Sequence, residues 1–191
     1  MKGRFFLLAV SLIFLSSTAK AWDLAWRLGG IGAWWDMKAG DNNLFSNTAG
    51  FSLGLEGRTD VGDSKLILGG VNYQNLYNRQ ADDDEHFTAQ GVSLNGALGY
   101  YFRKGEKLKF WAGPEVTAAF LEGSMTEAGD YFTLRRYGLG GAAGLFLIPA
   151  EGWTLGGRVG LDYSVIKGSG KDVGSIKGKG PGSYLLMGFD F

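Results

Sequence analysis

The stretch WTLGGRVGLDYSV, residues 153–165, alternates between two kinds of side chain with a period of two. Its odd-numbered positions are mainly large and apolar, among them Trp153, Leu161 and Tyr163, whereas its even-numbered positions are small or polar, among them Arg158 and Asp162. Successive side chains of a β-strand point to opposite faces, while an amphipathic helix repeats its apolar residues every three or four positions. The stretch therefore predicts a strand with one apolar face and one polar face.

The same alternation recurs through the rest of the chain, so we predict an all-β protein. It marks eight segments, the shortest of which, 183–191, has nine residues. Strands of globular proteins usually have about 5 to 6 residues, whereas tilted strands that cross a bilayer need about 9 to 11. These features favour an eight-stranded antiparallel up-and-down transmembrane β-barrel. The predicted strands are 24–36, 49–58, 65–77, 87–102, 108–121, 131–147, 153–165 and 183–191.

The connections between these segments alternate in length. Short, turn-like connections at 59–64, 103–107 and 148–152 separate longer ones at 37–48, 78–86, 122–130 and 166–182. Outer-membrane barrels show this pattern, because their periplasmic turns are short and their extracellular loops are long. The last connection is rich in glycine, which predicts a mobile loop.

The first 21 residues predict an export signal. Lys2 and Arg4 precede an apolar run at 5–15, and Ala19-Lys20-Ala21 supplies a cleavage site. The run is too short to cross a bilayer as a helix, for which about 20 residues are needed. We therefore expect a signal peptide at 1–21 and a mature outer-membrane β-barrel domain at 22–191.

Composition excludes several classes of function. The chain has 191 residues, with 33 Gly, one His and no Cys, and its 19 basic residues balance its 19 acidic residues. The lack of Cys removes disulfide frameworks, thiolate catalysis and Cys-based zinc sites. The lack of a basic excess argues against nucleic-acid binding. We expect no cofactor and no metal site.

The polar face distinguishes a membrane barrel from a soluble lipocalin-type barrel, which would turn its polar face to water. Its mid-strand charges are nearly all Arg, Asp and Glu, a combination suited to buried bidentate pairs. We expect these groups to form ion pairs in a narrow lumen that side chains fill, with a narrow channel as the alternative. Inward Gly138, Gly140, Gly156 and Gly160 would leave room for Arg136 and Arg158. The predicted lumen residues are Arg27, Glu56, Arg58, Glu115, Arg136, Arg158 and Asp162.

Aromatic residues gather near both ends of the predicted strands, as expected for the two interfaces of a bilayer. One belt holds Trp26, Tyr100, Phe102, Phe110, Trp153, Phe189 and Phe191, and the other holds Trp34, Tyr73, Tyr77, Phe120, Tyr131 and Tyr163. The segment 131–147 is irregular, because its apolar residues occupy both parities. We therefore expect a bulge or a late strand start near Arg135.

The chain resembles the small outer-membrane barrels of the OmpA and OmpX type. The resemblance lies in the signal peptide, the eight strands and the last strand, which carries Leu185, Met187, Phe189 and Phe191 on one face. The segment 110–120 also resembles a strand common in the outer-membrane β-barrel family. The resemblance implies that the barrel assembly machinery recognises Met187, Phe189 and Phe191, and that the protein lies in the outer membrane of a Gram-negative bacterium among lipid and lipopolysaccharide.

These features predict a non-enzymatic, monomeric barrel with a structural or surface-interaction role. The alternative is a lipid A-modifying enzyme that would use His86 with a serine such as Ser93, as a resemblance to the outer-membrane lipid A deacylases or palmitoyltransferases would require, although the motif of neither family is present. His86 follows the acidic residues 82–85, which could bind a divalent cation or keep the loop solvated.

The connection at 166–182 carries a net positive charge, whereas those at 78–86 and 122–130 are acidic. We hypothesise that its lysines contact lipopolysaccharide phosphates or an acidic partner through charge-assisted bonds. The alternative is a loop that the charges merely keep soluble. The four residues are Lys167, Lys171, Lys177 and Lys179.

Overall fold

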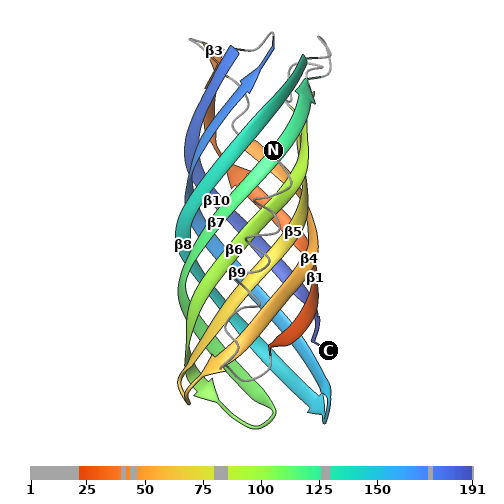
Figure 1. The fold of residues 1–191 in the computed structure, drawn as a ribbon, viewed down its shortest axis with the longest axis vertical. Helices are drawn as coiled ribbons and strands as arrows, with labels where there is room; N and C mark the ends of the chain where they lie inside the picture. The colour runs from red at the N-terminus through yellow and green to blue at the C-terminus, as the bar shows by residue number, and fades with distance from the viewer. Residues whose placement is uncertain are drawn as a thin grey trace.

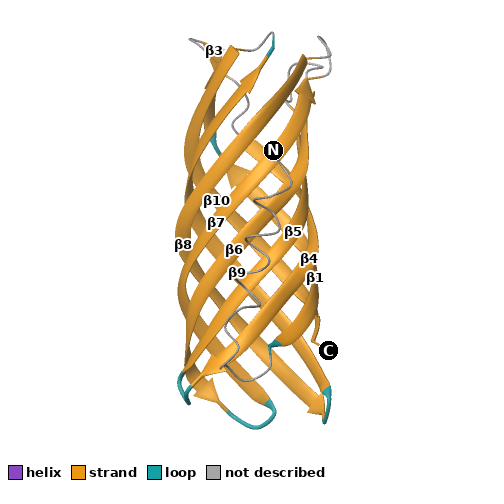
Figure 2. Cartoon of the chain, viewed as in Figure 1, coloured by secondary structure: helices purple, strands orange, loops and turns teal. Residues whose placement is uncertain are grey.

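The computed structural model describes residues 22–39, 42–43, 47–79, 86–125, 130–171 and 174–190, which form a closed antiparallel β-barrel (Figure 1). Figure 2 shows strands and connecting turns throughout these residues. The part of the chain that is described contains no helix with the length and apolar character to cross a membrane. The strands of the ring are β1 (Asp23–Trp34), β4 (Asn47–Val61), β5 (Lys65–Arg79), β6 (His86–Lys104), β7 (Leu108–Met125), β8 (Asp130–Ala150), β9 (Trp153–Gly170) and β10 (Gly174–Asp190).

The first and last strands close the ring. Each ring strand pairs with the next along the chain, and β1 pairs with β10 from Ala25 opposite Asp190 to Ala33 opposite Gly182. The short strand β2 (Asp36–Ala39) continues β1 and also pairs with β10, and β3 (Asn42–Asn43) pairs with β2. The prediction of an eight-stranded up-and-down barrel is therefore confirmed.

The two ends of the barrel differ in their connections. We call the end with the turns at 62–64, 105–107 and 151–152 the turn end, and the opposite end the loop end. Gly62 and Gly152 adopt φ values of 67° and 77°, which only glycine reaches without a steric penalty. These residues let the chain reverse direction within a few positions.

The strands reach farther toward the loop end than the alternation predicts, and the prediction of a mobile loop at 166–182 is wrong. Strand β9 continues to Gly170 and β10 begins at Gly174, so most of this segment belongs to two paired strands. Ile166 and Ile176 point into the lumen and are each 1 % exposed. These two buried residues show that the inward-facing side of the strands extends through this segment, although its glycines and lysines give it the composition of a linker.

The predicted irregularity near Arg135 is also wrong. Strand β8 begins at Asp130 and keeps its register with β9 as far as Leu147. Phe132 and Leu134 point into the lumen, whereas Tyr137 and Leu139 point outward. Both parities are apolar because the lumen itself is apolar at this level.

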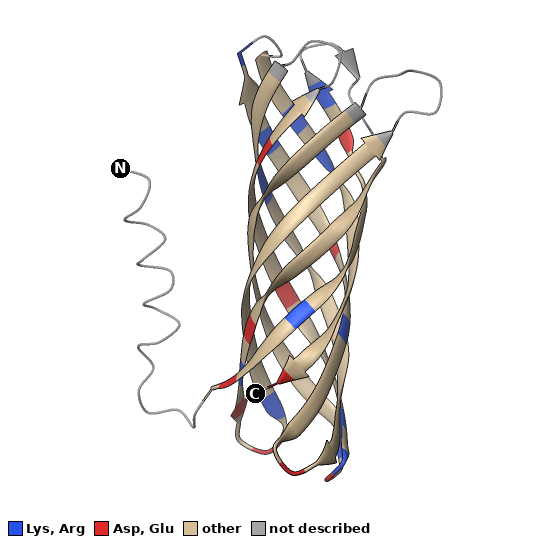
Figure 3. Ribbon diagram, turned by 90° about the vertical axis from the view of Figure 1, so that its right-hand side faces the viewer, with Lys and Arg blue, Asp and Glu red and all other residues tan. Residues whose placement is uncertain are grey.

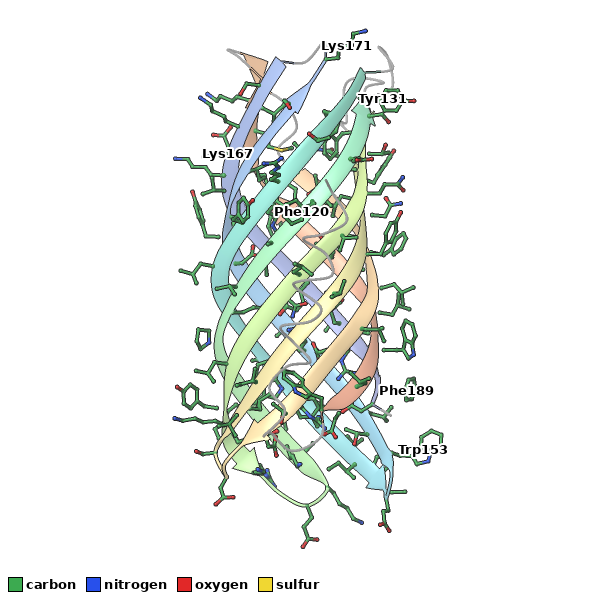
Figure 4. All side chains as sticks on the ribbon, in the orientation of Figure 1. Phe120, Tyr131, Trp153, Lys167, Lys171 and Phe189 are labelled. Carbon is green, nitrogen blue, oxygen red and sulfur yellow. The ribbon has the colours of Figure 1, made fainter. Side chains whose placement is uncertain are left out.

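The outer wall of the barrel is apolar and the central lumen is polar. Figure 4 shows Trp153 and Phe189 on the outer wall near the turn end, and Phe120 and Tyr131 closer to the loop end. Since soluble barrels expose their polar face, this arrangement is that of a barrel surrounded by lipid. The exposed large apolar residues include Trp26, Leu28, Trp34, Phe51, Leu53, Tyr73, Phe102, Phe120, Leu139, Trp153, Leu161, Tyr163, Leu185, Met187 and Phe189.

The lumen has three layers. Two clusters of buried apolar side chains lie toward its ends, and most of the buried charged residues lie between them, although Arg58 packs against Phe146 of the turn-end cluster. The turn-end cluster consists of Leu66, Leu68, Ala97, Trp111, Ala142 and Phe146, with Tyr101 against it. The larger loop-end cluster consists of Ile31, Ala33, Trp35, Met37, Leu76, Phe87, Ala89, Ala119, Leu121, Phe132, Leu134, Ile166 and Ile176.

Candidate functional site

Glu56 is the centre of the ion-pair network in the lumen. Its carboxylate lies between two guanidinium groups, with Oε1 3.2 Å from Arg27 Nε and Oε2 2.9 Å from Arg158 Nε. Arg158 Nη1 also donates to Glu115 Oε1 at 3.0 Å. These four residues come from β1, β4, β7 and β9, and each is 2–4 % exposed. Four strands are therefore cross-linked through side chains at one level of the barrel.

Tyr184 completes this network from β10. Its hydroxyl donates to Glu115 Oε2, and the Arg158 guanidinium lies 5.0 Å from the centre of its ring. The predictions from the sequence did not include this residue. Its parity in the last strand, opposite to that of Leu185 and Met187, is the signal that places it inward.

A second part of the network lies toward the turn end and joins the two strands that close the barrel. Asp190 of β10 accepts from Arg27 Nη2 of β1 at 2.7 Å and lies 3.0 Å from Arg58 Nη1 of β4. Arg58 Nη2 also donates to Asp23 at 2.7 Å, and its guanidinium stacks 4.0 Å from the Phe146 ring. Asp23 and Asp190 were not predicted, because they stand at strand ends where the sequence pattern is weakest.

Arg136 and Asp162 form another cluster nearer the loop end. The two side chains make an ion pair, and Arg136 Nε donates to Ser164 Oγ at 2.8 Å. Thr117 Oγ1 donates to Asp162 Oδ2 at 2.8 Å, and the Arg136 guanidinium lies 5.2 Å from the Trp35 ring. The structure thus brings all seven predicted lumen residues into contact with groups of opposite charge, in two clusters.

Inward glycines make room for the larger members of these clusters. A Cβ atom at Gly156 would lie 2.6 Å from Arg27 Nη2, and one at Gly138 would lie 2.6 Å from Asp162 Oδ2. At Gly160 an added Cβ would collide with the Tyr184 ring, and at Gly140 with the backbone of Leu161. The sequence suggested that these glycines leave room for Arg136 and Arg158. The structure places other groups next to them, namely Arg27, Asp162, Tyr184 and the Leu161 backbone.

Little space remains within the polar layer. The structure has a cavity of about 30 Å³ there, lined in part by Ser52, Asn72, Gln74, Ser93 and Tyr184. That volume holds about one or two water molecules. Among the described residues, no group of three or more His, Asp or Glu side chains could hold a metal ion.

The residues of the enzyme alternative lie far apart. His86 opens β6 opposite Arg79, and Ser93 is a buried inward residue farther along the same strand, where it donates to the Asn72 carbonyl at 3.5 Å. Seven residues of an extended strand span about 23 Å. The two residues therefore cannot act on the same bond. The acidic residues 82–85 lie outside the described residues.

The predicted lysines lie on or beside the outer wall at the loop end. Lys167 of β9 and Lys177 and Lys179 of β10 point outward and are exposed, and Lys171 lies in the turn between these strands. Figure 3 shows basic residues gathered near this end, and Figure 4 shows Lys167 pointing away from the barrel. At the other end, Met187 and Phe189 are exposed on β10. Phe191 lies outside the described residues.

The closed ring, its apolar outer wall and its polar lumen define an eight-stranded transmembrane β-barrel. This is the architecture of the small outer-membrane barrels of the OmpA and OmpX type. No protein-family model matches the chain, and neither does any curated protein sequence.

The solved structures that are similar to this chain include those of two bacterial proteins. One is Ail, the attachment invasion locus protein of Yersinia pestis, at 14 % identity and a TM-score of 0.43, covering 90 % of this chain and 100 % of that one. The other is surface protein A of Neisseria, NspA, at 15 % identity and a TM-score of 0.45, covering 84 % and 95 %. Both TM-scores are below 0.5, so the assignment of the fold rests on the strand order and the burial pattern.

Proposed function

We propose that the protein is a non-enzymatic outer-membrane β-barrel with a closed lumen and a structural or surface-interaction role. The observation that carries this proposal is the three-layer filling of the lumen. A channel needs a continuous water path, whereas here apolar clusters lie on both sides of a densely paired polar layer. An eight-stranded barrel is just narrow enough for side chains to fill it completely.

The ion-pair network supports a structural role. It joins side chains from β1, β4, β7, β9 and β10, so it ties together strands that are not neighbours in the ring. Guanidinium–carboxylate pairs in a low-dielectric interior hold fixed geometries when their hydrogen bonds are satisfied. The barrel wall is therefore a rigid support for whatever the loop end presents.

Export, assembly and partners belong to the same proposal. The signal peptide at 1–21 would direct the chain out of the cytoplasm, and Met187, Phe189 and Phe191 would be read by the barrel assembly machinery. The mature barrel would then stand as a monomer among outer-membrane lipids and lipopolysaccharide, with its turn end toward the periplasm. The outward position of Met187 and Phe189 supports this assignment, because they are accessible from the lipid side.

Two measurements on the full-length protein test the proposal. Membrane fractionation should recover it in the outer membrane, in a form whose gel mobility changes on heating. In planar bilayers the purified barrel should give a flat current trace. Recovery from the soluble periplasm would overturn the membrane placement, and stable unitary conductance would replace the closed barrel with a narrow channel.

A further inference from the structure

Four basic residues meet side by side on the outer wall near the loop end. Arg135 of β8 is opposite Lys167 of β9, Lys167 is opposite Lys177 of β10, and Lys177 is opposite Lys38 of β2. All four are exposed and lie on outward positions of their strands. We call them the basic row. With neighbouring strands about 4.8 Å apart, the row extends about 14 Å across the wall.

The basic row lies at the boundary between the apolar wall and the polar rim. On β8 and β9, the next outward residues toward the turn end are Tyr137 and Val165, followed by Leu139 and Tyr163, and all four are exposed. On β10 and β2, the next outward residues are Lys179 and Asp36, which are opposite each other. Two residues toward the loop end, the corresponding positions are hydroxyl residues, namely Thr133, Ser169 and Ser175. In a bilayer, that boundary is the level of the lipid headgroups.

The arrangement of the basic row is unfavourable without an external anion. Like charges directly opposite one another in a sheet repel. Within the part of the chain that the structure describes, no ion pair joins any of the four to an acidic residue. Two acidic residues lie on neighbouring outward positions: Asp36 is opposite Lys179, and Glu122 is opposite Thr133.

The basic row occupies one side of the barrel only. Followed in the other direction, the same line of outward positions passes through Phe120 of β7, Val92 of β6 and Tyr73 of β5, none of which is charged. Because the strands are tilted, this line descends the wall, and it continues through Leu53 and Leu28 to Met187 near the turn end. The four cations are thus concentrated on adjacent strands near the loop end, which indicates a localised ligand.

We propose that the basic row binds the phosphate groups of a glycolipid in the outer leaflet, such as lipopolysaccharide. The inference rests on the proposed outer-membrane placement and deepens it. A ligand with several phosphates would neutralise adjacent cations at once, and charge-assisted bonds to phosphate are among the strongest hydrogen bonds of proteins. A lipid fits better than a soluble anion, because the row faces sideways into the headgroup layer beside exposed Tyr137 and Tyr163. The site includes Lys38 and Arg135, which the sequence did not single out, and excludes Lys171 and Lys179, the latter being opposite Asp36.

The test compares two variants of equal charge change in the purified, folded barrel. One variant removes the basic row by Lys38→Gln, Arg135→Gln, Lys167→Gln and Lys177→Gln. The matched control removes four basic residues at the turn end by Lys65→Gln, Arg103→Gln, Lys107→Gln and Lys109→Gln. Native mass spectrometry in detergent measures the binding of lipid A that carries both phosphates, of the same lipid after dephosphorylation, and of inorganic phosphate alone. A double variant, Lys167→Gln with Lys177→Gln, serves if the quadruple variant does not fold.

The wild-type barrel should bind phosphorylated lipid A in preference to the dephosphorylated form. Each basic residue near an anionic lipid surface contributes roughly a fivefold factor in affinity. The row variant should therefore bind at least about tenfold more weakly, the double variant should be intermediate, and the control should match the wild type. Equal losses in the row variant and the control would overturn the site, as would binding that ignores the phosphates or saturates with inorganic phosphate. A barrel that fractionates with the outer membrane but fails this test refutes the site alone.

Discussion

The inner and outer walls of the barrel use basic residues in opposite ways. In the lumen, Arg27 and Arg158 are almost fully buried and each is in contact with two carboxylates. On the outer wall, Lys167 and Lys177 are exposed, directly opposite each other and without such a partner among the described residues. A buried charge must be paired within the protein, because the interior offers no solvent to stabilise it. An exposed charge can take its counterion from the surroundings, so unpaired cations on the wall indicate where an external anion binds.

Glu56→Ala should have the largest effect on stability, since it leaves Arg27 and Arg158 each short of a carboxylate in the lumen. Breaking a buried ion pair by removing one partner costs about 3 to 5 kcal/mol. Urea unfolding of the barrel in lipid vesicles measures this loss. The exposed Glu122→Ala on the outer face of β7 is the control and should change stability by less than about 0.5 kcal/mol. Equal effects would mean that the inner network contributes nothing beyond a surface charge.

Asp190→Ala tests the part of the network that closes the ring. Arg27 keeps Glu56 and Arg58 keeps Asp23, so we expect a smaller loss of about 1.5 to 3 kcal/mol, the usual contribution of a hydrogen bond to a charged group. The loss should disappear against a background in which both Arg27 and Arg58 are already replaced. A loss that persists there would assign the effect to the strand end.

Gly160→Ala tests the space in the lumen. The added methyl would collide with the Tyr184 ring, and overpacking of this kind costs about 1 to 3 kcal/mol. Gly141→Ala is the matched control, because Gly141 is exposed on the outer wall and its added Cβ would come no nearer than 3.5 Å to any neighbour. Urea unfolding in lipid vesicles should therefore give a clearly lower free energy of unfolding for Gly160→Ala than for Gly141→Ala. If they unfold together, the lumen is more loosely packed than the structure indicates.

Lys167→Gln should have the smallest effect, with the opposite sign. Removing one member of an opposed pair of like charges relieves about 0.2 to 1 kcal/mol of repulsion. In neutral detergent at low salt, the variant should therefore unfold at slightly higher urea than the wild type, and high salt should erase the difference. With phosphorylated lipid A bound, the wild type should become the more stable of the two. A variant that is less stable in neutral detergent would show that Lys167 has a partner within the protein.

The alternation of side chains along each strand predicted much of the lumen network. The features that it failed to predict have physical explanations. The inward positions of Arg136, Arg158 and Asp162 follow from the alternation, as does the choice of Arg over Lys for buried pairing. The alternation does not distinguish an apolar lumen layer from a strand irregularity, which explains the wrong expectation near Arg135. The alternation is also too weak to recognise where two isolated isoleucines stand among glycines and lysines. For this reason it predicts a loop over a segment in which Ile166 and Ile176 point into the lumen.

The sequence by itself determined that the chain forms long strands with unlike faces, because a period of two can be read within a single segment. Only the tertiary structure decided which residues meet. The stagger between neighbouring strands sets which arginine reaches Glu56, and it also aligns Lys38, Arg135, Lys167 and Lys177 in one row. Register is fixed by ring closure and by packing in the lumen, and these depend on all eight strands at once. The basic row therefore could not be seen in any one stretch of the sequence.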